Sequence, residues 1–263
     1  MSPAGYTLQW KGPRSAAPTD GAVLRADTLG MLDRDTLAAT RMRIGRVHVP
    51  LGEVFDIVGS AGQRLTVRGA PPLDHVGEGM ANGELVIEGD VGDDLGASMK
   101  GGTIRVTGDA GARVGGPSAT SRRGMTGGRM VIQGNAGDYL GLRMRRGWIV
   151  VGGRAGKSPG YRMLAGTIAL GGGPADHPGL EMRRGSILLL DPRAEVTTSA
   201  AMRELGTFEL EALPGLRLML CELNRITSTT DLRTKTFRGR GPFRGWVGDV
   251  CELGRGELWQ MVC

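Results

Sequence analysis

The sequence predicts an all-β fold, a right-handed parallel β-helix made of coils of about 19 residues and closed by a cap at each end. Glycines that open similar short segments recur along the chain, and the last four are spaced by 19 residues. The opening glycines are Gly83, Gly102, Gly128, Gly147, Gly166 and Gly185. A fixed period of this length is typical of one supersecondary unit stacked on copies of itself.

A methionine stands three residues before each opening glycine. These methionines are Met80, Met99, Met125, Met144, Met163 and Met182. Their spacing cannot follow one face of a helix, whose period is about 3.6 residues. Because methionine fills irregular gaps in cores, the pattern predicts an internal column of stacked thioethers.

Each opening glycine starts a short predicted strand. Two apolar positions in each segment lie two residues apart and therefore point to the same face. The pairs are Leu85 and Ile87, Ile104 and Val106, Met130 and Ile132, Ile149 and Val151, Ile168 and Leu170, and Ile187 and Leu189. Equivalent residues of successive coils should stack at a strand spacing of about 4.8 Å. A propeller needs blades of about 40 residues or more, and a leucine-rich solenoid needs a Leu-rich consensus with Asn or Cys, so both fit less well.

The chain divides into three predicted parts. They are an N-terminal cap segment at 1–60, the parallel β-helix repeats at 61–192, and a C-terminal cap or subunit-contact segment at 193–263. An exposed terminal coil would be an open sheet edge, so we expect the caps and a partner subunit to cover both ends.

The flanks also carry predicted elements. In the first segment we expect a strand at 6–10, a helix near 33–41 and a degenerate first coil around 42–49, and residues 62–69 should form the second coil. In the last segment, a helix is expected near 211–224.

One step of the repeat is longer than the others. Gly102 and Gly128 are 26 residues apart, and the surplus lies near 115–123, which contains two arginines. Solenoids accept insertions as loops on one side. We therefore expect a flexible basic loop that leaves the coil.

Composition restricts the compartment and the class of protein. The 263 residues include 46 glycines and only 4% aromatics, but 40% are hydrophobic and regularly placed, which argues against disorder. Cys221, Cys251 and Cys263 share no CxxC spacing, so neither a disulfide framework nor a metal cluster is expected. With no signal-like start and no apolar run of membrane length, we expect a cytoplasmic protein without a membrane segment.

The histidines do not form a predicted metal or catalytic site. His75 and His177 share a column, but they lie about five coils or roughly 24 Å apart, and His48 stands alone. A neighbouring column contains Asp74, Asp93, Asp138 and Asp176. We interpret it as turn residues that hydrogen-bond their own backbone.

Other catalytic patterns are also missing. Residues 152–158 (GGRAGKS) resemble a phosphate loop, but Val151 occupies the position that requires glycine. No serine has a nearby base, and no pair of glutamates has a distinctive spacing. The sequence therefore predicts a chain without catalytic residues, metal or cofactor of its own.

The basic residues form rows, and the formal net charge is +6. One column holds Lys100, Arg145 and Arg183, the next holds Arg146 and Arg184, and another holds Arg143 and Arg162. Such rows are either a solvated turn face or a stripe that binds an anionic partner. Arginine pairs bidentately with carboxylates, so an acidic protein surface or a polycarboxylate chain fits better than nucleic acid, for which interleaved aromatics are lacking.

Several motifs resemble a known family. Residues 89–96 (GDVGDDLG) and 134–141 (GNAGDYLG) are similar to repeats of the glutamate synthase C-terminal domain and of the C subunit of formylmethanofuran dehydrogenase. Residues 50–56 (PLGEVFD) and 247–257 (VGDVCELGRGE) resemble the second family. The Arg-rich, Lys-poor composition points to its bacterial homologue, the C subunit of the formyltransferase/hydrolase complex.

The resemblance implies a role in one-carbon metabolism. That complex moves a formyl group from formyl-tetrahydromethanopterin to a methanofuran-type carrier and releases formate. The active sites belong to a formyltransferase subunit and an amidohydrolase-like subunit, so the C subunit would be a scaffold. Because these carriers have glutamyl tails, the seven basic residues of the rows are the candidate contacts for an acidic tail.

Two alternatives remain open. The chain could be the C subunit of a molybdenum- or tungsten-containing formylmethanofuran dehydrogenase, with pterin and iron–sulfur partners. It could also be a stand-alone carbohydrate-active β-helix enzyme, which would need a carboxylate cluster on one face. Outside the turn column the sequence shows no such cluster.

Overall fold

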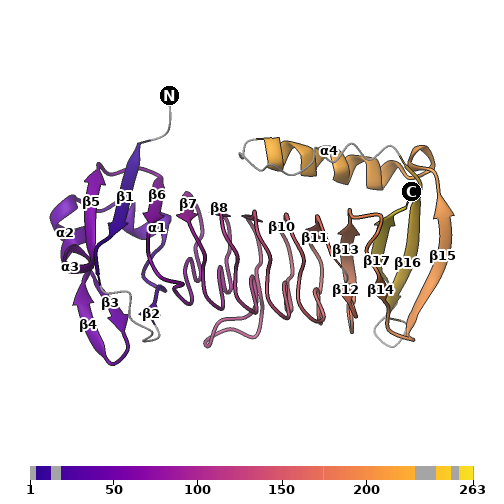
Figure 1. Ribbon diagram of the computed structural model, residues 1–263, viewed down its shortest axis with the longest axis horizontal. Helices are drawn as coiled ribbons and strands as arrows, with labels where there is room; N and C mark the ends of the chain where they lie inside the picture. The colour runs from indigo at the N-terminus through magenta and orange to yellow at the C-terminus, as the bar shows by residue number, and fades with distance from the viewer. Residues whose placement is uncertain (1–3, 13–18, 174, 229–240, 250–254, 263) are drawn as a thin grey trace.

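Twelve strands of the computed structural model lie in one sheet that runs along the molecule (Figure 1). In spatial order they are β15 (Met202–Phe208), β16 (Phe243–Asp249), β17 (Arg255–Met261), β13 (Arg184–Leu189), β11 (Thr167–Leu170), β10 (Trp148–Val151), β9 (Arg129–Ile132), β8 (Thr103–Val106), β7 (Glu84–Glu88), β6 (Arg64–Arg68), β1 (Gly5–Trp10) and β5 (Phe55–Gly59). The structure describes residues 4–12, 19–173, 175–228, 241–249 and 255–262.

Helices and two small sheets accompany the main sheet. The helices are α1 (Ala26–Leu29), α2 (Arg34–Ala39), α3 (Leu51–Val54) and α4 (Pro214–Ser228), with a 3-10 turn η1 (Leu210–Ala212). One small sheet contains β2 (Thr19–Asp20), β3 (Arg41–Ile44) and β4 (Val47–Pro50), and the other contains β12 (Ala175–Asp176) and β14 (Val196–Thr197).

The predicted fold class, an all-β right-handed parallel β-helix with caps, is wrong. The main sheet is mixed: β1 pairs with β5, β15 with β16, and β16 with β17 in antiparallel fashion, and the remaining neighbours are parallel. With its helices, the chain is of a mixed α/β class. The 19-residue period describes only the middle of the chain, and the non-repeating flanks supply the antiparallel strands and the helices.

The repeats place their strands side by side in register. Ile149 of β10 pairs with Met130 of β9 and with Ile168 of β11, so residues one period apart are direct neighbours. All six methionines of the column are fully buried, as are Met130, Ile149 and Ile168. The predicted stacking of apolar and thioether side chains is therefore confirmed. Burial of this column stabilises the repeats, because fully burying one such side chain contributes about 1.5–3 kcal/mol.

Aspartates tie each repeat to the next. The Oδ1 atom of Asp93 accepts a 2.8 Å hydrogen bond from the Ala112 amide, 19 residues later, and Asp138 accepts one of 2.7 Å from Lys157. The prediction that this column bonds its own turn is wrong for these residues. In the stacked geometry the amide of the next repeat, 19 residues later, donates to the carboxylate.

The same ladder explains one glycine column. A Cβ atom on Gly156 would lie 2.2 Å from Asp138 Oδ1, so only glycine leaves space for the carboxylate. The opening glycines of the repeats are required for a different reason. At Gly147, φ is +107° and a Cβ would lie 2.6 Å from the Met125 methyl carbon of the preceding repeat.

Helix α4 covers the outer face of strands β9 to β13 (Figure 1). Its buried side chains include Leu216, Leu220 and Leu223, which form one cluster with a column of outward-facing strand residues. That column is Val131, Val150, Ala169 and Leu188. The predicted helix near 211–224 is confirmed, with its bounds displaced toward the C-terminus.

The N-terminal predictions have mixed outcomes. Strand β1 and helix α2 are confirmed, and Asp33 caps α2 by accepting hydrogen bonds from the amides of Asp35 and Thr36. Strand β6 confirms the coil expected at 62–69. The degenerate coil expected around 42–49 is wrong: β3 and β4 form an antiparallel hairpin that turns at Gly45, where φ is +59°.

Across the described residues, every helix falls short of the length and apolar character that crossing a membrane requires.

Candidate functional site

A cationic hollow of about 770 Å³ lies along the turn segments that precede the strands of the repeats. Its lining residues are Arg123, Thr126, Arg145, Arg146, Leu164, Ala165, Gly166, Arg183 and Arg184. Among the residues that the structure describes, no carboxylate lines this hollow. The five guanidinium groups therefore face one open space, and we refer to it as the arginine hollow.

The repeat itself positions these arginines. Arg145 and Arg183 each follow a buried methionine, and their amides bond the carbonyls of Met125 and Met163 at 2.8 and 2.9 Å. With the methionine fixed inward, the next side chains project to solvent, and both arginines are exposed. They lie two repeats apart, which is about 10 Å at the strand spacing. That separation is close to the Debye length of about 8 Å at physiological salt, so their fields overlap.

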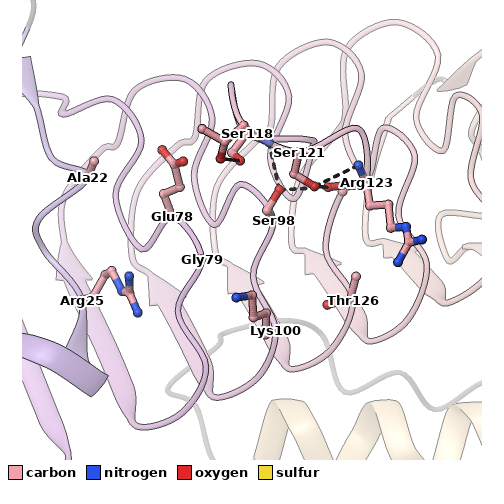
Figure 2. A pocket seen from close by; sticks show the side chains of 12 residues that line it. Ala22, Arg25, Glu78, Gly79, Ser98, Lys100, Ser118, Ser121, Arg123 and Thr126 are labelled. Carbon is pink, nitrogen blue, oxygen red and sulfur yellow. Dashed lines mark hydrogen bonds between the residues drawn. The ribbon is translucent and has the colours of Figure 1, made fainter.

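A second hollow of about 630 Å³ adjoins the first (Figure 2). Its lining residues are Ala22, Arg25, Glu78, Gly79, Ser98, Lys100, Ser118, Thr120, Ser121, Arg123, Gly124 and Thr126. Arg123 and Thr126 line both spaces, so the two hollows form one groove. We call the second part the hydroxyl hollow because five of its lining side chains carry a hydroxyl group.

The inserted segment forms one wall of the hydroxyl hollow. Within 115–123 the structure contains no helix or strand, which confirms that the insertion is a loop, and its expected flexibility stays a prediction. Ser98 fastens it: its Oγ atom accepts a 2.9 Å hydrogen bond from the Ser118 amide and donates one of 2.9 Å to the Arg123 carbonyl (Figure 2). Ser121 Oγ adds bonds of 3.1 Å to the Arg123 amide and carbonyl.

An ion pair stands at the far end of the hydroxyl hollow. Arg25 donates two hydrogen bonds to the carboxylate of Asp27, whose side chain is 6% exposed. Burial alone would raise the pKa of Asp27, but the bonds from Arg25 and from the Ala81 amide together lower it. The positive charge of Arg25 is therefore balanced by the carboxylate of Asp27.

The structure brings together five of the seven basic residues expected at the site. Arg145, Arg146, Arg183 and Arg184 line the arginine hollow, and Lys100 lines the hydroxyl hollow. Arg143 and Arg162 line neither. They stand one residue before the buried methionine of their repeats, whereas Arg145 and Arg183 stand one residue after it.

Arg162 belongs to a separate cluster. Its Nε atom bonds Glu181 Oε2 at 2.6 Å, and its guanidinium lies 5.0 Å from the centroid of the Tyr161 ring. The hydrogen bond from Arg162 lowers the pKa of Glu181. Burial and the 3.0 Å bond from its hydroxyl group to Glu181 raise the pKa of Tyr161.

Arg123 and Ser98 are the site residues that the repeat pattern does not reveal. Arg123 lies in the insertion, where no column can be assigned, although the length and basic character of that segment mark it as unusual. Ser98 occupies the column of Arg143 and Arg162, and nothing in its sequence context indicates the contact with the loop.

The histidine and aspartate columns do not converge. His75 lies 3.4 Å from Asp20 and 3.6 Å from Asp94, and His177 contacts Asp176 at 2.6 Å. Asp94 is also bound by Arg113, and this hydrogen bond raises the pKa of the guanidinium. Among the described residues, no three His, Cys, Asp or Glu side chains are grouped as metal ligands would be. Cys251 and Cys263 lie outside those residues.

Comparison with known proteins gives relatives of one kind. No family model matches the chain. The C subunit of molybdenum-containing formylmethanofuran dehydrogenase 1 from Methanothermobacter thermautotrophicus is 36% identical over 82 residues, and that from Methanothermobacter marburgensis is 35% identical. These matches cover 30% of this chain and span only 20% of each relative's length.

A solved structure matches over nearly the whole chain. It is the crystal structure of the formyltransferase/hydrolase complex (FhcABCD) from Methylorubrum extorquens in complex with methylofuran. One of its chains has a TM-score of 0.79 and 32% identity to this chain, with 98% of this chain and 100% of that chain covered. The repeats, the flanks and this full-length likeness agree, and the chain belongs to the family of formylmethanofuran dehydrogenase C subunits.

Proposed function

We propose that this chain is a non-catalytic scaffold subunit of a cytoplasmic formyltransferase/hydrolase complex. Such a complex moves a formyl group from formyl-tetrahydromethanopterin to a methanofuran-type carrier and releases formate. The observation that carries the proposal is the likeness to one chain of such a complex along its whole length. The partners would be a formyltransferase subunit and an amidohydrolase-like subunit, and residues 1–60 and 193–263 would act as caps and subunit contacts.

The chemistry of the groove supports binding. Arginine stays charged at every physiological pH and presents a planar fork of donors that matches a carboxylate. It does not exchange protons at neutral pH, so it is poorly suited to acid–base catalysis. An anion that bridges Arg146 and Arg184 would relieve the repulsion between stacked like charges.

The candidate ligand is the acidic tail of the carrier. Arg145, Arg146, Arg183 and Arg184 would bind its carboxylates, and Lys100 would extend the basic surface into the hydroxyl hollow. Arg143 and Arg162 remain contacts of a more distant part of the tail, although Glu181 competes for Arg162. The carrier would be bound by the complex, and the chain alone would hold no cofactor.

The test is purification of the complex through an affinity tag on this chain. Mass spectrometry should identify the two enzyme subunits in fixed stoichiometry with it. The double variant Arg145→Glu/Arg146→Glu should retain those subunits and lose most of the carrier at low salt. The matched control is Arg34→Glu/Arg41→Glu, which changes charge equally at exposed positions of α2 and β3. Failure to recover either enzyme subunit would refute the scaffold role, and undiminished carrier would refute only the tail contact.

A second candidate is the C subunit of a molybdenum-containing formylmethanofuran dehydrogenase. The identity of 36% over 82 residues to such a protein favours it. The same purification separates the two candidates, because a dehydrogenase would bring molybdopterin and iron–sulfur proteins with this chain. Metal analysis and pterin fluorescence of the purified material provide the readout.

A further inference from the structure

The groove changes character along its length. At one end lie Arg145, Arg146, Arg183 and Arg184, and no acidic side chain of the described residues lines this end. At the other end the lining carries Lys100, Glu78 and five hydroxyl groups, and the one guanidinium group besides that of Arg123 belongs to Arg25, which is paired with Asp27. The lining of the hydroxyl hollow therefore carries less positive charge than that of the arginine hollow.

The inserted loop stands at this transition. Arg123, the last arginine of the series, belongs to the loop and lines both hollows. Ser98 holds the loop through one bond to the Ser118 amide and one to the Arg123 carbonyl, each of 2.9 Å (Figure 2). Loss of the Ser98 hydroxyl would release both contacts and allow the backbone of Arg123 to move.

We infer that the loop fastened by Ser98 sets the length and polarity of the chain that the groove accepts. The ligand is an extended molecule with its carboxylates clustered on one segment, which lies over the arginines. A neutral, hydrogen-bonding segment then passes Arg123 and enters the hydroxyl hollow. This inference rests on the proposed function, because it assumes that an acidic chain occupies the groove.

The structure gives the length of the charged segment. From Thr126 to Arg183 the arginine hollow spans three repeat steps, or about 14 Å at the strand spacing. An extended peptide covers about 3.3–3.6 Å per residue, so about four consecutive acidic residues fill this part. Carboxylates beyond the fourth meet the hydroxyl hollow, where Glu78 offsets the charge of Lys100 and each further carboxylate adds less binding than it does beside the arginines.

The test measures binding of L-glutamate oligomers of two, four, six and ten residues to the purified full-length chain at low salt, by calorimetry. Affinity should rise steeply up to about four residues and then level off. Ser98→Ala should weaken hexaglutamate binding by about threefold to tenfold, since two hydrogen bonds are released.

Ser158→Ala is the matched control. Ser98 and Ser158 both have a positive φ, of 53° and 50°, so the two alanine variants carry the same backbone strain, and only one touches the loop. Equal binding by Ser98→Ala and Ser158→Ala, or affinity that climbs steadily to ten residues, would overturn this inference. Arg145→Glu/Arg183→Glu tests the parent proposal: if this variant binds hexaglutamate normally, the acidic-chain site itself is wrong.

Discussion

Docking of α4 on the sheet can be tested with one substitution, Leu223→Ala. Leu223 is fully buried between the helix and the outward column of the strands, in one cluster with Val150 and Leu188. Removing its three outer carbons costs roughly 2.4 kcal/mol from lost burial, at about 0.8 kcal/mol per carbon. The cavity that remains adds to this cost, and measured Leu→Ala changes in cores reach about 5 kcal/mol.

Hydrogen exchange followed by mass spectrometry is the suitable assay, because α4 should open separately from the repeats. Leu223→Ala should speed exchange in the peptide that covers α4 by more than tenfold, and peptides of β10 and β11 should change much less. Leu218→Ala is the control, since Leu218 lies on the same helix and is 72% exposed. If both variants exchange at the same rate, the helix is not held by this apolar face.

Three further outcomes follow from the repeats and from the N-terminal ion pair. Asp109→Ala removes the 2.7 Å hydrogen bond from the Asn135 amide and should lower the free energy of unfolding in urea by about 0.5–1.5 kcal/mol. Gly147→Ala drives a Cβ against the Met125 methyl carbon at a φ of +107°, and the melting temperature by circular dichroism should fall further than for Gly215→Ala, where nothing lies within 4 Å. The pKa of Asp27 is lowered in the folded chain, so its stabilisation is present above its ordinary pKa and is lost as pH falls through the folded value. Asp27→Asn should therefore flatten the decline of stability below about pH 4, and an unchanged acid titration of stability would contradict this assignment.

The repeats were predictable because they obey a period. Once Met144 and Ile149 are placed, the same positions in the next repeat follow 19 residues later, and the structure pairs them in register. The fold class was not predictable from that period, since the antiparallel ends depend on contacts between segments distant in sequence. Strand β5 pairs with β1 across about fifty residues, and no local pattern marks this pairing.

The part of the candidate site that lies in the repeats was also predictable from the sequence. Arg145 and Arg183 fall in a column, so their shared direction could be read from the sequence. Arg123 and Ser98 could not be found in this way, because an insertion has no register with the repeat and its path depends on side-chain hydrogen bonds. For Arg162 the period predicts the position in the repeat but not the partner. Glu181, one repeat later, accepts a hydrogen bond from its guanidinium group.

The in-register ladder makes the length of this molecule adjustable in whole units. Deleting or duplicating one complete 19-residue repeat would leave every remaining Asp-to-amide contact and every stacked methionine with an equivalent neighbour. Each such event would move the two ends of the sheet by a single strand spacing of about 4.8 Å. The distance between surfaces attached at the two ends can therefore change in evolution by the gain or loss of one repeat, while both surfaces stay the same.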